Sequence, residues 1–232
     1  MVTLVRVPRL LFRALACATF EFLWTVAPAR ANTIIDFKDA ALIGGTVSYD
    51  GNGGALVGAN IVLQYVLGLD TPSELGAHGL TGALLNFSTG GYSGGSGSTY
   101  NFSNGGSFQI TGKVDNACDL YGTLCNTSDV LLTGSFLGAT VNGGGVTFTG
   151  GTDTKNSALL AFFGLPANTQ FAFGPANVQF NPSYGQNGSF SGTAYSTDVS
   201  NTVVPEPGSM MLFGSGLVGL STLIRRRRQQ KS

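Results

Sequence analysis

The central part of the sequence, residues 32–204, contains no arginine, no methionine and no tryptophan. Charge is scarce throughout, since charged residues make up 10% of the chain. In this central part three lysines face ten acidic residues, which gives a net charge of −7. Nucleic-acid binding requires a basic surface, so this composition excludes nucleic acid as a partner.

Histidine is nearly absent, because His78 is the single histidine in the 232 residues. A hydrolytic triad needs a histidine beside a nucleophile on a strand-to-helix turn. The G-x-S-x-G stretch at residues 91–95 lies instead in a glycine–serine segment. We therefore expect His78 in a surface loop and no enzymatic activity. Paired carboxylates, Asp36 with Asp39 and Asp115 with Asp119, leave a secreted hydrolase as the third alternative.

Cysteine is also scarce, with Cys17 near the start and two more in the central part. In an oxidising compartment Cys118 and Cys125 are expected to form one local disulfide. With one histidine available, a zinc site is not expected. Oxygen ligands around this disulfide make calcium a weak candidate, although they lack EF-hand spacing; they are Asp115, Asp119 and Asp129, with Asn116 and Asn126. No cofactor is expected.

The N-terminus has the pattern of a secretory signal peptide. Arg6, Arg9 and Arg13 precede an apolar run at residues 14–26, and the small residues Ala29 and Ala31 follow it. We predict a signal peptide at residues 1–31, cleaved after Ala31. Arg13 and Glu21 interrupt the pattern, which leaves an uncleaved membrane anchor as an alternative.

The C-terminus has three consecutive parts. Pro205, Glu206 and Pro207 precede an uncharged run of 17 residues, 208–224. Such a run is at the lower limit for a membrane-spanning helix. The cluster that follows stops the span and marks its cytoplasmic side; it consists of Arg225, Arg226, Arg227 and Arg228. The body is therefore expected outside the membrane.

This order of features resembles the PEP-CTERM sorting signal. Proteins of this family are found in Gram-negative bacteria that make exopolysaccharide. The resemblance covers only the tail, residues 205–228. It implies that Pro205, Glu206 and Pro207 are recognised by exosortase, a transpeptidase-like membrane enzyme, and that the inner membrane holds the chain transiently. The two prolines also keep the recognition segment extended. An ordinary membrane anchor remains the alternative.

The body, residues 32–197, is expected to be one all-β domain. It is rich in Gly, Ser, Thr and Asn, with aromatics spread throughout, which is typical of strands joined by turns. About nine to eleven short alternating segments predict a single β-sandwich of jelly-roll or Greek-key type. A right-handed β-helix is the alternative, although no fixed repeat period is present.

Several local expectations follow from the same patterns. Residues 89–98 are glycine–serine rich and expected to be a loop, and residues 99–102 and 107–114 a hairpin across Asn104. Residues 157–163 fit a short helix or a buried strand. Residues 198–204 are expected to be a linker. Four tyrosines offer stacking faces for sugars but are expected in the core or in turns; they are Tyr92, Tyr100, Tyr121 and Tyr184.

The sequence therefore predicts an exported protein of the bacterial cell surface or exopolysaccharide matrix, membrane-anchored before processing. Its partners would be exosortase, the inner membrane and an exopolysaccharide. The role of the body is expected to be structural or interactive. A carbohydrate-binding or adhesin module is the alternative.

Overall fold

The computed structural model describes residues 33–39, 44–203 and 215–216. Most of them belong to strands, which confirms the all-β prediction. The strands are β1 (Thr33–Lys38), β2 (Thr46–Tyr49), β3 (Ala55–Gly68), β4 (Gly76–Ser96), β5 (Thr99–Phe102), β6 (Gly106–Val114), β7 (Val130–Asn142), β8 (Gly145–Lys155), β9 (Phe171–Tyr184) and β10 (Phe190–Val203). Two short helices, α2 (Asp115–Tyr121) and α3 (Ser157–Phe162), and a 3₁₀ turn, η1 (Gln186–Gly188), interrupt them.

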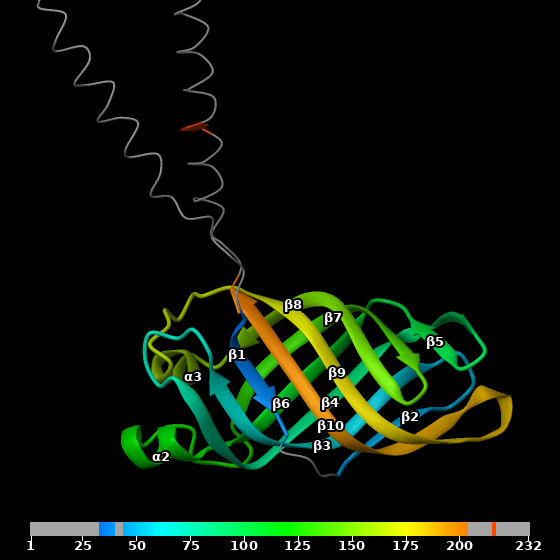
Figure 1. Ribbon diagram of the computed structural model, residues 1–232, viewed down its shortest axis with the longest axis horizontal. Coiled ribbons are helices and arrows are strands. Elements are labelled where there is room, and N and C mark those ends of the chain that lie inside the picture. Colours follow the sequence, from blue (N-terminus) through cyan, green and yellow to red (C-terminus); the bar gives the residue numbers. More distant parts are fainter. Residues whose placement is uncertain (1–32, 40–43, 204–214, 217–232) are drawn as a thin grey trace, which may run out of the picture. The chain divides into compact units, whose positions relative to one another are not determined.

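The ten strands form one antiparallel sheet that closes on itself (Figure 1). β10, β9, β8 and β7 are neighbours in that order, and β4 lies beside β3. Two pairs of short strands complete the circle. β5 and β6 both join β7 to β4, and β1 and β2 both join β3 to β10. Each of the ten described strands therefore has a neighbour on both sides, and none of them is an edge strand of the kind that templates aggregation.

The expected sandwich of two sheets is thus wrong in its architecture. The strands are longer than the short segments expected for a sandwich. β4, for example, has 21 residues and includes most of the segment expected to be a glycine–serine loop. Bulges bend the long strands where Asn60 and Gly82 adopt positive φ. A bulge increases twist and curvature, which lets one sheet wrap around a single core. In the sequence alone, a glycine inside a long strand cannot be told from a glycine in a turn.

Two other local expectations are corrected, and one helix is added. β5 and β6 do not pair with each other, so residues 99–114 are not a hairpin. Residues 198–203, expected to be a linker, are the last part of β10. The segment around the cysteines contains helix α2. The ambiguous residues 157–163 form helix α3, whose first turn Asn156 caps by accepting a hydrogen bond from the Ala158 N–H at 2.9 Å.

The sheet has two distinct ends. At the terminal end, β1 begins, β10 ends, and helices α2 and α3 are inserted (Figure 1). At the hairpin end, tight connections join β2 to β3, β4 to β5, β7 to β8, and β9 to β10. The core between them is apolar and contains a stack in which the rings of Phe108, Phe136 and Phe148 are 4.8 and 4.3 Å apart.

Candidate functional site

The terminal end brings the two ends of the domain together. In the antiparallel pairing of β1 with β10, Thr33 lies opposite Thr202 and Ile35 opposite Asn201. The segment that precedes residue 33 and the segment that follows Val203 therefore leave the sheet from adjacent strands. The predicted signal-peptide cleavage, after Ala31, is two residues before the start of β1.

The expected disulfide is present at the same end. Cys118 in α2 is bonded to Cys125, with their Cα atoms 4.9 Å apart. Gly122 ends the helix in the left-handed conformation, at φ 67°, which turns the chain back so that the two cysteines meet. This confirms the pairing predicted for an oxidising compartment.

The weak calcium candidates do not converge on one point. Asp115 accepts a hydrogen bond from the Thr81 hydroxyl at 2.9 Å and lies 3.5 Å from the Lys113 ammonium. Asp129 instead accepts from the backbone N–H of Asn126 at 3.0 Å, and Asp119 is exposed on α2. In the described part of the chain, no three acidic, histidine or cysteine side chains gather as metal ligands would.

His78 is buried on β4, so the expectation of a surface loop is wrong. Its ring lies edge-on to Phe162 and Phe163, with centroids 4.9 and 5.7 Å away, and its Nε2 donates to the Glu74 carbonyl at 2.9 Å. The imidazole packs α3 against β4. It has neither a serine nor a carboxylate in hydrogen-bonding contact, so it forms no triad with the described residues.

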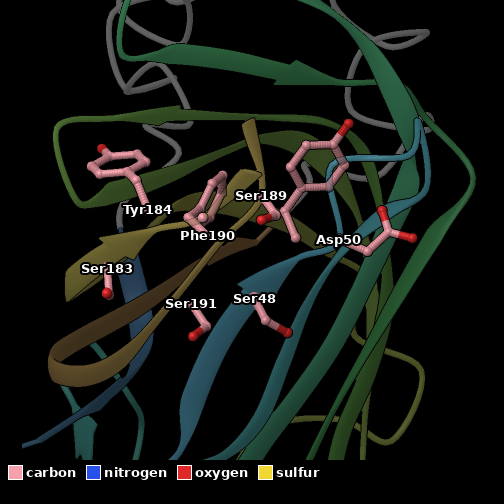
Figure 2. Close-up of a pocket in the computed structure, with 9 residues that line it drawn as sticks. Ser48, Asp50, Ser183, Tyr184, Ser189, Phe190 and Ser191 are labelled. Atoms are coloured by element: carbon pink, nitrogen blue, oxygen red, sulfur yellow. The ribbon is translucent and has the colours of Figure 1, made fainter. Parts of the chain in front are cut away.

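A hollow of about 450 Å³ lies at the hairpin end (Figure 2). Its volume falls in the range of small-molecule sites. The lining comes from β2, β9, β10 and the turns beside them; it consists of Ser48, Tyr49, Asp50, Ser183, Tyr184, Gly185, Ser189, Phe190 and Ser191. The hydroxyls and one carboxylate supply polar contacts, and no basic side chain lies among them.

Strand register arranges this lining in two rows. Ser191 on β10 lies between Ser183 on β9 and Ser48 on β2, and Figure 2 shows these three serines side by side. One residue along, Phe190 lies between Tyr184 and Tyr49 in the same way. Because successive residues of a strand face opposite sides, the register produces a serine row and an aromatic row. The two rows therefore lie on opposite faces of the sheet, and in the aromatic row Phe190 and Tyr49 are buried in the core whereas Tyr184 is exposed.

Tyr49 anchors the aromatic side of the hollow. It is buried, its ring centroid is 5.2 Å from that of Phe102 and 5.7 Å from that of Phe190, and it stacks on Tyr92 at 5.5 Å. Tyr184 is 52% exposed and Tyr92 37% exposed. Both were expected in the core or in turns, whereas they lie in β9 and β4 and are partly exposed. Sequence reasoning missed the hollow because its residues come from strands distant along the chain.

The sorting residues lie outside the described part of the chain. This applies to Ala29 and Ala31, to Pro205, Glu206 and Pro207, and to Arg225, Arg226, Arg227 and Arg228. Of the predicted span at residues 208–224, only Ser215 and Gly216 are described. Within the described ranges, no helix combines the length and apolar character that a membrane crossing requires.

Comparison with known proteins adds a finding for the tail. No curated protein and no solved structure matches the chain. The family model of the PEP-CTERM protein-sorting motif matches residues 203–228. Those residues include the triplet, the apolar run and the arginine cluster on which the resemblance rested, and they begin at the last residue of β10. The chain thus carries at its C-terminal end a PEP-CTERM protein-sorting motif, the mark of a secreted protein that exosortase sorts.

Proposed function

We propose that this chain is a surface or exopolysaccharide-matrix protein whose body has a structural or interactive role and no enzymatic activity. The observation that carries the proposal is the sorting motif at residues 203–228, which begins where β10 ends. A signal peptide, residues 1–31, delivers the chain across the inner membrane. The apolar run then holds it until exosortase recognises Pro205, Glu206 and Pro207 and cuts nearby.

The fold supports a role outside the cell. A closed sheet has no free edge strand, so it resists pairing with other chains at high local concentration. The Cys118–Cys125 disulfide is of the kind that persists in oxidising compartments. Both features suit a domain that remains outside the cell after its tail has been removed.

Mass spectrometry of the protein from its native cells tests the sorting proposal. We expect a chain that begins at Asn32 and ends near Pro205. Glu206→Ala should leave the tail attached and the protein in the membrane fraction, because it removes the charge between the two prolines. Ser209→Ala, three residues further on, is the matched control and should be processed normally. A bulk protein that retains Arg225 to Arg228 would contradict the proposal and leave a plain anchor.

The hollow at the hairpin end favours a second candidate function, binding of an exopolysaccharide. The exposed Tyr184 gives sugars an apolar stacking face, and serine hydroxyls with the Asp50 carboxylate give them hydrogen-bonding partners. The hollow lies at the end of the sheet opposite to the one that bears the tail.

A polysaccharide panel distinguishes the two candidates. If the body binds sugars, one polysaccharide should bind saturably, and Tyr184→Ala should weaken that binding by about fivefold, because stacking on one aromatic ring contributes on the order of 1 kcal/mol. Tyr195→Ala is the control, since Tyr195 is 44% exposed but lies outside the hollow. Retention in the matrix without saturable binding would favour the structural role.

A further inference from the structure

Three polar side chains meet inside the apolar core at the terminal end. Asp153 and Lys155 project inward from β8, and both side chains are fully buried. Asn201 projects inward from β10, two strands away, and is also fully buried. Taking charges out of water is costly, and a buried ion pair seldom recovers that cost. A contribution to stability therefore does not explain why these three polar side chains are buried together.

One carboxylate joins the other two side chains. The Lys155 Nζ donates to Asp153 Oδ1 at 2.6 Å, and the Asn201 Nδ2 donates to Asp153 Oδ2. An amine and a carboxamide are thus held against the two oxygens of a single acid. The Phe171 ring covers the amine, with Nζ 3.5 Å from the ring centroid. The Asn201 Oδ1 is buried and has no hydrogen-bond partner among the described residues.

The other two lysines of the body provide a comparison. Lys38 lies 2.9 Å from Asp36, and Lys113 lies 3.5 Å from Asp115, so each also pairs with an acid two residues away. Both of these ammonium groups reach solvent. Their acids take a second hydrogen bond from a hydroxyl, that of Ser200 or Thr81. At Lys155 alone among these three does a carboxamide share the acid, in a site closed to water.

We propose that Lys155 and Asn201 react to form an intramolecular amide crosslink between β8 and β10, with Asp153 carrying the proton. This is a modification site in which the protein acts once on itself. The arrangement supplies a nucleophile, an electrophilic carboxamide and an acid–base group in contact with both, inside a pocket that excludes competing water.

The step balances without any further reactant. Asp153 accepts a proton from the Lys155 ammonium, and the neutral Nζ attacks the Asn201 Cγ. Asp153 then delivers that proton to Nδ2 and takes up the second proton that Nζ loses as it becomes an amide nitrogen. The bond between Cγ and Nδ2 breaks, ammonia leaves, and a new amide joins Nζ to Cγ. No oxidation or reduction occurs.

Burial adjusts both ionisable groups in the direction that this chemistry needs. It lowers the pKa of the Lys155 ammonium to about 8, against the opposing attraction of Asp153. It also raises the pKa of the Asp153 carboxyl, against the opposing effects of Lys155 and Asn201. Each shift favours the neutral amine and the protonated acid, because a low-dielectric site disfavours both charges.

The crosslink would have a mechanical consequence for an anchored protein. β10 is the strand from which the sorting motif continues. Any force on the tail is therefore applied first to β10. A covalent bond to β8, across β9, would prevent β10 from being pulled out of the sheet.

The intact mass of the full chain tests this directly. We expect it to lie below the mass calculated from the sequence by that of one ammonia molecule, after terminal processing and the disulfide are taken into account. Digestion under denaturing, reducing conditions with a protease that cleaves before aspartate separates residues 153–197 from the peptide that begins at Asp198. These two peptides should be recovered joined through Lys155 and Asn201.

Variants identify the reacting groups. Lys155→Arg and Asn201→Ala should abolish the mass deficit and the joined peptides, and so should Asp153→Ala. Lys113→Arg, in the exposed lysine–aspartate pair, is the matched control and should retain both. Separate peptides and a full calculated mass in the wild-type chain would overturn the proposal, whether or not the variants fold. A deficit that persists in Lys155→Arg would indicate an internal imide at Asn201 and would equally overturn it.

Discussion

At the scale of single residues, Asp36 combines burial with two nearby charges. Its side chain is 3% exposed, lies 2.9 Å from the Lys38 ammonium, and accepts a hydrogen bond from the Ser200 hydroxyl at 3.2 Å. Asp198 lies on the other side of the same lysine, at 3.6 Å. Burial, with a smaller contribution from Asp198, raises the pKa of Asp36 from 3.8 to about 6 despite Lys38.

This shift predicts how stability depends on pH. A carboxyl whose pKa is higher in the folded state holds its proton more tightly there than in the unfolded chain. Between about pH 4 and pH 6, the contribution of Asp36 to the unfolding free energy therefore falls as the pH rises. Asp36→Asn cannot titrate, so the decline across this window should become smaller. Urea unfolding at several pH values measures it.

The exposed Asp119 on α2 provides the control for this experiment. Asp119→Asn should leave the pH profile of the wild type unchanged. If Asp36→Asn and the wild type lose stability equally between the two pH limits, the buried carboxyl does not titrate in this window.

At the scale of elements, α3 depends on one residue for its first turn. Asn156 accepts from the Ala158 N–H, and its own Nδ2 donates to the Val130 carbonyl at 2.8 Å. The helix is only six residues long, and it buries Leu159, Leu160 and Phe162. So short a helix has little stability of its own, and its packing depends on this cap.

Asn156→Ala should lower the unfolding free energy by about 1 kcal/mol, because it removes the N-cap hydrogen bond. Chemical denaturation measures the change. Asn116→Ala, at an exposed position of α2, is the matched control and should shift stability by less than about 0.5 kcal/mol. Equal effects of the two substitutions would mean that the cap contributes nothing specific.

At the scale of the whole molecule, closure of the sheet at its terminal end depends on the last six residues of β10. Lys38 pairs with Asp198 and Thr33 with Thr202, so β1 is attached to β10 entirely through residues 198–202. The same segment also pairs with β9. Without it, the sheet would open between β1 and β9 and expose core side chains such as Phe37.

A chain shortened to end at Val203 should therefore fold cooperatively, whereas one that ends at Thr197 should not. Thermal unfolding followed by circular dichroism distinguishes them, and amide exchange shows whether β1 and β9 remain protected. The two chains differ by six residues, so they differ little in composition. Similar melting curves for both would show that residues 198–203 are a linker after all.

Much of the fold class followed from local patterns. Short alternating segments predicted an all-β domain, and the spacing of Cys118 and Cys125 predicted the disulfide, since each pattern depends on neighbours in the chain. The last part of β4 was missed, because its glycines made residues 89–98 resemble a loop. A glycine that provides a bulge and one that provides a turn look the same in sequence.

The sequence by itself determined export and sorting, because charge, apolar length and the Pro205–Pro207 triplet act as contiguous signals that need no folded context. Only the tertiary structure decided that the sheet closes, that Ser48 lies beside Ser191, and that Asp153 touches both Lys155 and Asn201. These contacts join strands that are far apart in the chain. They exist because the bulged strands curve until the first and last strands pair, and that pairing is a property of the whole core.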